Sequence, residues 1–412
     1  MKFDQLALIK PILQAIEDKG YETPTKIQAS AIPIILKRKD VLGIAQTGTG
    51  KTAAFAIPII QLIYRIDGNK HKKPPIRALI LTPTRELAIQ IDENIREYNK
   101  YTKIKHTVIF GGVKQGKQVQ AIQKGIQILV ATPGRLLDLI NQGILTLDDI
   151  KVFVLDEADR MLDMGFIHDI RKLLKVIPKE RQTLFFSATM PANIIALSSK
   201  MLVDPQRVEV ARKSSAAEAI DQFVYYTNRD KKVDLLNYIL EDTEDEQILV
   251  FVRTKHGADR LARKLKKGRF RADAIHGNKS QNGRQKTLKK FKEKQTKILV
   301  ATDIAARGID ITKLKYVINY DIPNVPETYI HRIGRSGRAG EEGIAISISE
   351  PEDNTHVKAI ERLSKKTIKK VDDHPFPQTV KPMTEKEKKE WNKEKQRRKQ
   401  EFFRNRKKNS RR

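Results

Sequence analysis

Residues 45–52 have the sequence AQTGTGKT, and residues 152–159 have the sequence VFVLDEAD. The first stretch follows an apolar run and is typical of a strand, a glycine-rich loop and a helix. Gly48 and Gly50 let the backbone bend until its N–H groups converge on phosphate oxygens, and the positive end of the following helix faces the same anion. The second stretch is a buried strand that delivers two carboxylates at its carboxyl end, where open α/β sheets bind ligands. Together they predict a site for a nucleoside triphosphate with magnesium.

Individual residues of these stretches have expected roles. Lys51 reaches the β- and γ-phosphates and Thr52 holds Mg²⁺, whereas Ala45 stands where the general phosphate-loop pattern has its first glycine. Asp156 is suited to the metal, directly or through water, and Glu157 to activation of the attacking water. Taken alone, each stretch has a plainer alternative, a surface turn and a solvated acidic pair. Their presence in order predicts binding and cleavage of the triphosphate.

Composition narrows the class of protein. The chain has 412 residues, which suit two domains and an additional segment. Its net charge of +30 indicates a polyanionic partner, most simply nucleic acid, with a basic membrane-surface protein as the alternative. No apolar run approaches the ~20 residues that a membrane-spanning helix needs, and MKFDQLALIK at the amino terminus lacks the apolar core of a secretory signal. The absence of cysteine excludes disulfides and thiolate chemistry and agrees with a reducing cytoplasm, which is the expected location.

The hydrophobic pattern predicts an α/β fold. Short apolar runs alternate with amphipathic stretches from about residue 30 to 350, which favours mostly parallel sheets with helices on both faces. ILVAT occurs at 128–132 and at 298–302, and ILTPTRELA at 80–88 matches VFVRTKHGA at 250–258 with the same offset of 170 residues. We therefore expect two copies of one α/β unit, the second without a phosphate loop.

The predicted domains are an ATP-binding domain over 1–207, a linker over 208–219, a second domain over 220–370 and a basic tail over 371–412. Residues 381–412 hold 15 Lys/Arg and 5 Asp/Glu, and their few aromatic residues (Trp391, Phe402, Phe403) cannot build a core. We expect a disordered tail that captures nucleic acid by charge, with aromatic rings available for base stacking. A tail that only improves solubility is the alternative.

With these features in place, the chain resembles the DEAD-box RNA helicases of superfamily 2 over about residues 1–350. GYETPTKIQ at 20–28 resembles the family's Q motif, and PTREL at 83–87, GG at 111–112 and TPGR at 132–135 resemble its RNA-contact motifs. SAT at 187–189, ATDIAARGID at 301–310 and HRIGRSGR at 331–338 complete the series. The resemblance implies two tandem RecA-like domains, and Ala45 is normal in this family. MLDMGF at 161–166 and the basic end most resemble the bacterial RhlE-type branch.

The resemblance also assigns nucleotide contacts. Gln28 occupies the Q-motif position, where an amide can both donate to and accept from adenine. Phe3 resembles the family's isolated aromatic that stacks on the base, with an ordinary core residue as the alternative. Arg335 and Arg338 resemble its arginine fingers, which stabilise the transition state of phosphoryl transfer and reach the γ-phosphate only when the two domains close. The residues expected to bind ATP are Phe3, Gln28, Ala45, Gln46, Thr47, Gly48, Thr49, Gly50, Lys51, Thr52, Gly308 and Asp310.

Two further sets follow from the same motifs. Residues expected to couple the state of ATP to strand separation are Ser187, Ala188, Thr189, Asp159, Asp303 and His331. Residues expected to bind RNA are Thr84, Arg85, Gly112, Thr132, Gly134, Arg135, Thr254, Gly277, Arg284 and Thr302. Hydroxyl, guanidinium and backbone N–H groups suit sugar and phosphate contacts that do not distinguish sequence.

We therefore expect an RNA-stimulated ATPase, dependent on ATP and Mg²⁺, that locally opens short RNA duplexes and works as a monomer. Two alternatives stay open: a DNA helicase or translocase of the same superfamily, and an ATP-gated RNA clamp or annealing factor. The sequence does not identify the natural RNA or any protein partner.

Overall fold

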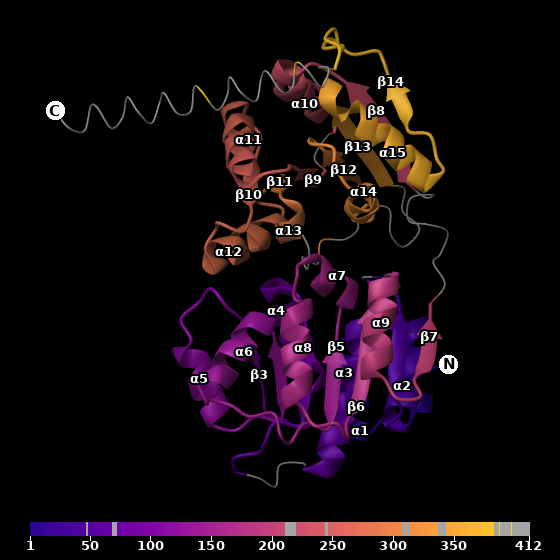
Figure 1. Cartoon of the computed structure of the whole chain (residues 1–412), viewed down its shortest axis with the longest axis vertical. Coiled ribbons are helices and arrows are strands. Elements are labelled where there is room, and N and C mark those ends of the chain that lie inside the picture. Colours follow the sequence, from indigo (N-terminus) through magenta and orange to yellow (C-terminus); the bar gives the residue numbers. More distant parts are fainter. Residues whose placement is uncertain are drawn as a thin grey trace, which may run out of the picture. The chain divides into compact units, whose positions relative to one another are not determined.

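A computed structural model describes residues 1–46, 48–67, 72–210, 220–243, 246–306, 311, 314–336, 343–382, 387 and 397. The chain divides into two compact units, each built on a seven-stranded sheet (Figure 1). Neighbouring strands pair in parallel throughout both sheets. The predicted α/β class with two parallel-sheet domains is confirmed.

The sheet of the first unit has the strand order β3-β4-β2-β5-β6-β1-β7. Its strands are β1 (Val41–Ile44), β2 (Ala78–Leu81), β3 (His106–Ile109), β4 (Ile128–Ala131), β5 (Val152–Leu155), β6 (Gln182–Ser187) and β7 (Gln206–Glu209). Its helices are η1 (Phe3–Leu6), α1 (Lys10–Asp18), α2 (Lys26–Leu36), α3 (Lys51–Ile66), α4 (Arg85–Tyr98), α5 (Gly116–Gln123), α6 (Pro133–Asn141), α7 (Ala158–Asp163), α8 (Ile167–Val176) and α9 (Ala192–Met201).

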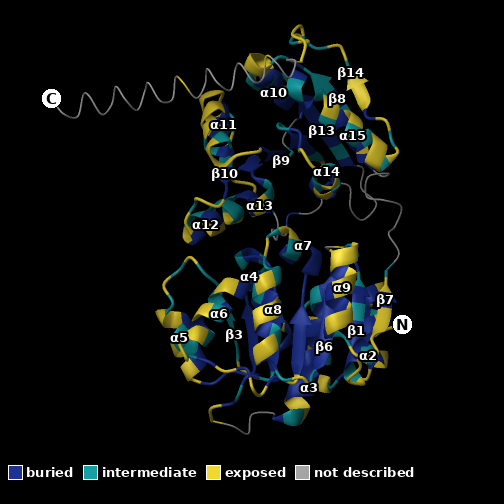
Figure 2. Cartoon of the chain, viewed as in Figure 1, coloured by how far each residue is buried: buried dark blue, intermediate teal, exposed yellow. Residues whose placement is uncertain are grey.

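Apolar side chains cover both faces of this sheet. Along β2, Ile80 joins the core under α1 to α4, whereas Leu79 joins the core under α6, α8 and α9. Strands buried on both faces are apolar at every position, as in β2 and β4, and they form the dark centre of the unit in Figure 2. The sheet is therefore a rigid platform that ends in loops at its carboxyl edge.

The second unit repeats this plan with the order β10-β11-β9-β12-β13-β8-β14. Its strands are β8 (Ile220–Tyr226), β9 (Ile248–Phe251), β10 (Ala272–Ile275), β11 (Ile298–Ala301), β12 (Tyr316–Asn319), β13 (Gly343–Ser349) and β14 (Lys369–Val371). Its helices are η2 (Arg229–Lys231), α10 (Lys232–Glu241), α11 (Lys255–Lys267), α12 (Gln281–Lys292), α13 (Asp303–Ala306), α14 (Pro326–Ile333), η3 (Pro351–Asp353) and α15 (Asn354–Ser364). The core under α10 and α11 lies on one face of the sheet and the core under α14 and α15 on the other.

The internal repeat predicted from the sequence is confirmed position by position. The two ILVAT segments form β4 and β11, which occupy the same place in the two strand orders. Thr84 and Thr254 both begin a helix with a side-chain oxygen that accepts from a backbone N–H three residues later, at 3.3 and 3.0 Å. This is the usual N-cap arrangement, and the two units build it identically.

The ends of the predicted domains differ in detail from the elements. Strand β7 extends to Glu209, past the predicted boundary at 207, and residues 211–219 of the predicted linker lie outside the described residues. The segment 372–380, assigned to the tail from the sequence, packs on the second unit: Phe376 contacts its core, and Asn228 Oδ1 accepts from the backbone N–H groups of Thr379 and Val380. Beyond residue 382 only Glu387 and Arg397 are described, so disorder of the tail stays a prediction.

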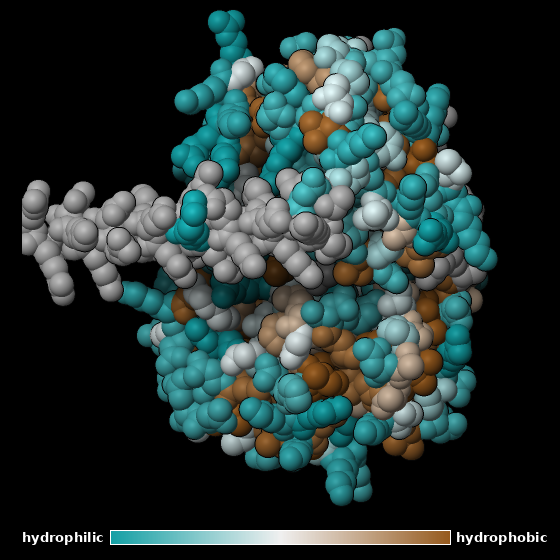
Figure 3. Space-filling view, turned by 45° about the horizontal axis from the view of Figure 1, so that its top comes forward, coloured by the Kyte–Doolittle hydropathy of each residue, from teal (hydrophilic) through white to brown (hydrophobic). Residues whose placement is uncertain are grey.

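Hydrophilic residues dominate the visible surface, with hydrophobic patches between them on the first unit (Figure 3). Among the described helices, none has both the length and the apolar character needed to span a bilayer.

Candidate nucleotide and RNA site

The phosphate loop lies between β1 and α3. Gly48 and Gly50 have φ angles of 82° and 92°, a backbone conformation that glycine adopts without steric cost. Lys51 is the first residue of α3, and its Nζ donates to the carbonyl oxygen of Ala45 at 2.8 Å. Across the loop, the Thr49 hydroxyl donates to the carbonyl oxygen of Gln46 at 2.8 Å. These bonds place the ammonium group of Lys51 and the amino end of α3 at the same loop. Thr47 lies outside the described residues.

Gln28 is attached to this loop. Its Oε1 accepts from the backbone N–H of Thr25 at 3.0 Å, which closes a capping box at the start of α2, and its Nε2 donates to the carbonyl oxygen of Gly50 at 3.2 Å. The Q-motif amide thus spans the helix and the phosphate loop, and the structure does not test its predicted contact with adenine.

Phe3 lies in the core of the first unit and is 4% exposed. Its ring stacks on that of Tyr21, with the centroids 6.4 Å apart. Tyr21 was not among the predicted site residues, although it lies within GYETPTKIQ. Because Tyr21 is only half-buried, part of its aromatic ring is exposed, and Phe3 packs against this ring from the core.

The acidic residues follow β5 directly. Asp156 and Glu157 are 2% and 3% exposed, and Asp156 Oδ1 accepts from the backbone N–H of Glu157 at 3.0 Å. Burial raises the pKa of Asp156 to about 6, and the positive charge of Lys51 opposes the rise. Glu157 adopts a left-handed backbone conformation, and Arg160 Nη1 donates to its Oε2 at 2.6 Å. Arg160 was missed from the sequence, because its role depends on a helical turn after the acidic pair.

The residues predicted to hold Mg²⁺ offer a hydroxyl and a carboxylate, which are the hard oxygen ligands that this ion prefers. The ionised form of Asp156 is disfavoured by burial, and a bound cation would relieve that cost. The donor set of Thr52 and Asp156 therefore fits magnesium.

A chain of hydrogen bonds joins the phosphate loop to the acidic loop. The backbone N–H of Ala45 donates to the carbonyl oxygen of Ser187 at 3.0 Å. The Ser187 hydroxyl donates to the carbonyl oxygen of Thr189 at 2.7 Å. Thr189 donates through both its backbone N–H and its hydroxyl to Asp159 Oδ2, each at 2.9 Å. The SAT segment is therefore hydrogen-bonded to both loops.

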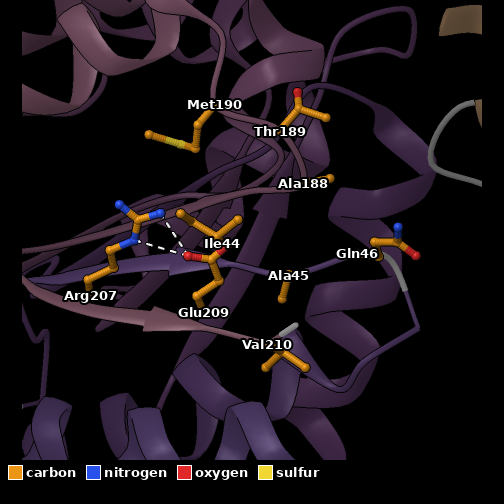
Figure 4. Close-up of a pocket in the computed structure, with 9 residues that line it drawn as sticks. All are labelled: Ile44, Ala45, Gln46, Ala188, Thr189, Met190, Arg207, Glu209 and Val210. Carbon is orange, nitrogen blue, oxygen red and sulfur yellow. Dashed lines mark hydrogen bonds and ion pairs between the residues drawn. The ribbon is translucent and has the colours of Figure 1, made fainter. Parts of the chain in front are cut away.

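A cavity of about 400 Å³ opens beside this chain of bonds. It is lined by Ile44, Ala45, Gln46, Ala188, Thr189, Met190, Arg207, Glu209 and Val210. Figure 4 shows Arg207 and Glu209 of β7 paired on one side of it, with Gln46 on the other.

The predicted RNA contacts of the first unit gather at the carboxyl edge of its sheet. Thr84 and Thr132 begin the helices that follow β2 and β4. A side chain at Gly112 would collide with the guanidinium of Arg85, so the two residues pack directly on each other. Arg135 donates to the backbone oxygen of Val113 at 3.1 Å, which places it against the same loop. Gly134 has open space where a side chain would stand.

In the second unit, Thr254, Gly277 and Thr302 follow β9, β10 and β11 at the corresponding edge, and Arg284 is buried on α12. Asp303 receives two bonds from Arg332, at 2.6 and 2.8 Å, a fork that links α13 to α14. Arg332 was missed, because nothing in HRIGRSGR shows which arginine turns inward. His331 is exposed on α14 and Arg335 is buried. Gly308, Asp310 and Arg338 lie outside the described residues.

The second unit has a lysine and an aspartate at the places that Lys51 and Asp156 occupy in the first unit. Lys232 is the first residue of α10, as Lys51 is of α3, and each helix follows the corresponding strand of its sheet. The backbone N–H of Asp321 donates to the end of β9, as that of Asp156 does to the end of β2. Lys232 Nζ lies 3.0 Å from Asp321 Oδ1, and Lys232 is 3% exposed. A closed ion pair therefore stands where the first unit has its phosphate site.

This geometry is that of a nucleoside-triphosphate-binding protein with two RecA-like domains. A family model described as DEAD/DEAH box helicase matches residues 25–197, and one described as helicase conserved C-terminal domain matches residues 231–340. The DEAD-box ATP-dependent RNA helicase CshA of Geobacillus kaustophilus is 43% identical over 369 residues, which cover 90% of this chain and 78% of that relative. The CshA of Bacillus subtilis is 43% identical over 366 residues, which cover 89% and 73%.

Similar solved structures are also DEAD-box proteins or bind RNA. A DEAD box protein from Methanococcus jannaschii is 43% identical, with a TM-score of 0.52 over 90% of this chain and 99% of that one. The Dbp5 of S. cerevisiae bound to RNA and ADP BeF3 is 32% identical, with a TM-score of 0.77 over 90% and 95%. The chain belongs to the DEAD-box helicase family.

Proposed function

We propose that this protein is an ATP-dependent RNA helicase that couples ATP hydrolysis to local opening of short RNA duplexes. One observation carries the proposal. The phosphate loop, the buried acidic pair and the first unit's candidate RNA contacts all lie at the carboxyl edge of one parallel sheet. The relatives named CshA are ATP-dependent RNA helicases, and the Dbp5 structure holds RNA with an ATP-like ligand, which supports both halves of the proposal.

Each residue at this edge has a chemical task. Lys51 neutralises the β- and γ-phosphates, and Thr52 and Asp156 hold Mg²⁺, which supplies further charge neutralisation when bound. Glu157 orients the attacking water, and Arg160 fixes the Glu157 carboxylate by the bond of 2.6 Å. Positioning and charge stabilisation of this kind account for most of the catalysis of phosphoryl transfer.

The remaining steps belong to the second unit. Arg335 and Arg338 act as arginine fingers once ATP and RNA draw the two units together, so that hydrolysis requires closure. Thr84 and Thr132, with Thr254 and Thr302, present matching hydroxyls to the sugar and phosphate groups of one strand. Hydrolysis then releases the strand.

Finer assignments are proposals of the same kind. The similarity to CshA-type helicases favours a CshA-like branch over the RhlE-type branch that MLDMGF and the basic end suggested. We place the protein in the cytoplasm as a monomer, with a basic tail that adds affinity for RNA and begins after the packed segment 372–380.

The test compares ATP hydrolysis by the full chain alone, with single-stranded RNA and with DNA of the same sequence. We expect stimulation by RNA and little by DNA, and opening of a short RNA duplex only with ATP. Glu157→Gln should bind ATP and RNA but should not hydrolyse ATP. Equal hydrolysis with and without RNA would refute the coupled enzyme. Equal stimulation by DNA would favour a DNA translocase, and full cellular function of Glu157→Gln would favour an ATP-gated clamp.

A further inference from the structure

The largest concentration of positive charge among the described residues lies on the second unit, outside the motifs. Residues 255–297 contain sixteen Lys/Arg and three Asp/Glu, a net charge of +13 in 43 residues. By comparison, the tail over 381–412 has a net charge of +10. The charge per residue is therefore about equal to that of the tail, but here it lies on a folded surface.

These residues belong to α11, β10, α12 and the turns between them. The helix α11 turns Ala258, Leu261 and Leu265 toward the core, so that its lysines and arginines face outward. The helix α12 buries only Gln281, Arg284 and Phe291 and exposes most of its length. Figure 2 shows the exposed side of α11, and the side of the second unit where Figure 1 places α11 is mostly hydrophilic in Figure 3.

The topology places the two helices on either side of one edge of the sheet. The crossover from β9 to β10 and the crossover from β10 to β11 run in opposite directions across the sheet. Because such crossovers are right-handed, α11 and α12 lie on opposite faces and flank the edge strand β10. Both helices begin beside the candidate RNA contacts Thr254 and Arg284 and run toward the amino ends of the strands. The thirteen residues of α11 span about 20 Å at 1.5 Å per residue.

The first unit provides an internal comparison, because α4 and α5 occupy the corresponding places in its sheet. The helix α4 has two Lys/Arg and four Asp/Glu, whereas α11 has six and one. The helix α5 has one Lys and no acidic residue, whereas α12 has five Lys/Arg and none. The fold therefore does not require these charges, and a binding role accounts for them.

We propose that the sides of α11 and α12 that border the edge strand β10, here called the basic band, hold the RNA segment that leaves the strand track. RNA fits the band because the positive charge is spread along a length and not confined to a point. A stacked strand of a duplex has one phosphate per about 3.4 Å, so 20 Å accommodates at most about six phosphates of one strand. The inference rests on the proposed function only in the choice of RNA as partner.

The test neutralises four exposed lysines in the full-length protein, Lys264→Gln, Lys267→Gln, Lys286→Gln and Lys292→Gln. None of them forms an ion pair with another described residue. A matched control neutralises four exposed lysines of the first unit in the same way, Lys37→Gln, Lys39→Gln, Lys124→Gln and Lys179→Gln. Affinity is measured against salt concentration for two RNAs. One is the shortest oligonucleotide that fully stimulates ATP hydrolysis by the wild type, and the other is the same oligonucleotide extended on both sides.

For the extended RNA, we expect the four substitutions to reduce the slope of log K against log salt by up to about 3, since each phosphate contact on a single strand contributes about 0.7. Binding of the short oligonucleotide and the ATP hydrolysis that it stimulates should not change. The control variant should keep the wild-type slope for both RNAs.

Three results overturn the inference: an unchanged slope for the extended RNA, an equal loss for both RNAs, or an equal loss in the control variant. An unchanged slope would leave an acidic protein as the partner for the band. If no RNA stimulates the wild type, the proposed function fails, whereas a slope that depends on the band would still support the RNA-binding surface.

Discussion

Gly50→Ala isolates the contact between the Q-motif amide and the phosphate loop. Gly50 has a φ of 92°, and a Cβ atom built there lies 2.5 Å from Gln28 Nε2 and 2.9 Å from Thr25 Oγ1. The substitution therefore strains the loop backbone and also displaces the amide that donates to the Gly50 carbonyl oxygen.

The expected magnitude follows from these two effects. A left-handed conformation costs a residue with a Cβ roughly 1–2 kcal/mol, and one lost neutral hydrogen bond costs about 1 kcal/mol. If ATP binding must restore the native loop, affinity falls by about 2–3 kcal/mol, which is roughly 30- to 150-fold.

The assay is equilibrium titration of the full chain with a fluorescent ATP analogue, together with thermal unfolding. Gly143→Ala is the matched control, because Gly143 has a φ of 68° and no atom within 4 Å of its Cβ position. The control should lower the unfolding temperature but leave ATP affinity unchanged. Wild-type ATP affinity in Gly50→Ala would refute the argument that Gln28 and the loop share one conformation.

Three other substitutions test hydrogen bonds and ion pairs described above. Thr189→Val keeps the side-chain shape but removes the hydroxyl bond to Asp159, so ATP binding should persist while duplex opening per ATP falls about tenfold, equivalent to ~1.4 kcal/mol; unchanged unwinding would contradict this. Arg332→Lys keeps the charge but loses the two parallel bonds to Asp303. It should lower the free energy of unfolding of the second unit by about 2 kcal/mol, which hydrogen exchange measures. Unchanged protection would show that these bonds do not stabilise the second unit. For Asp321, burial raises the pKa, but Lys232, the backbone N–H of Arg253 and the charge of Arg253 together lower it more, so the net pKa is lowered and the ionised form stabilises the fold. Asp321→Asn should therefore be less stable than wild type at pH 7, by a margin that shrinks as pH falls below about 4; urea unfolding that shows a constant margin down to pH 3 would refute the ion pair.

Much of the fold followed from local sequence patterns. Apolar runs such as ILVA at 128–131 and 298–301 predicted buried strands, because parallel strands covered on both faces are apolar at each position. The glycine-rich loop and the acidic pair at the ends of such strands then located the nucleotide site.

Other features depend on pairs that are distant in sequence or on helical facing. The fork between Asp303 and Arg332 joins residues 29 apart, and only the folded chain shows which arginine of the motif turns inward. Phe3 was expected to stack on a base, with an ordinary core residue as the alternative; its packing on Tyr21 in the core could not be seen in the sequence, and stacking on a base stays a prediction. The basic band was not predicted, because its charges are spread over two helices that come to border the same sheet edge only through the topology.

The ion pair of Lys232 and Asp321 has a consequence for nucleotide binding by the second unit. A triphosphate that bound there would have to take Lys232 from Asp321, whose carboxylate lies 3.0 Å away and is partly exposed. Because Lys232 is 3% exposed, removing its partner would leave a buried ammonium unpaired, which is unfavourable. The ion pair therefore joins the start of α10 to the loop after β12, at the place where the first unit has its phosphate loop and acidic pair.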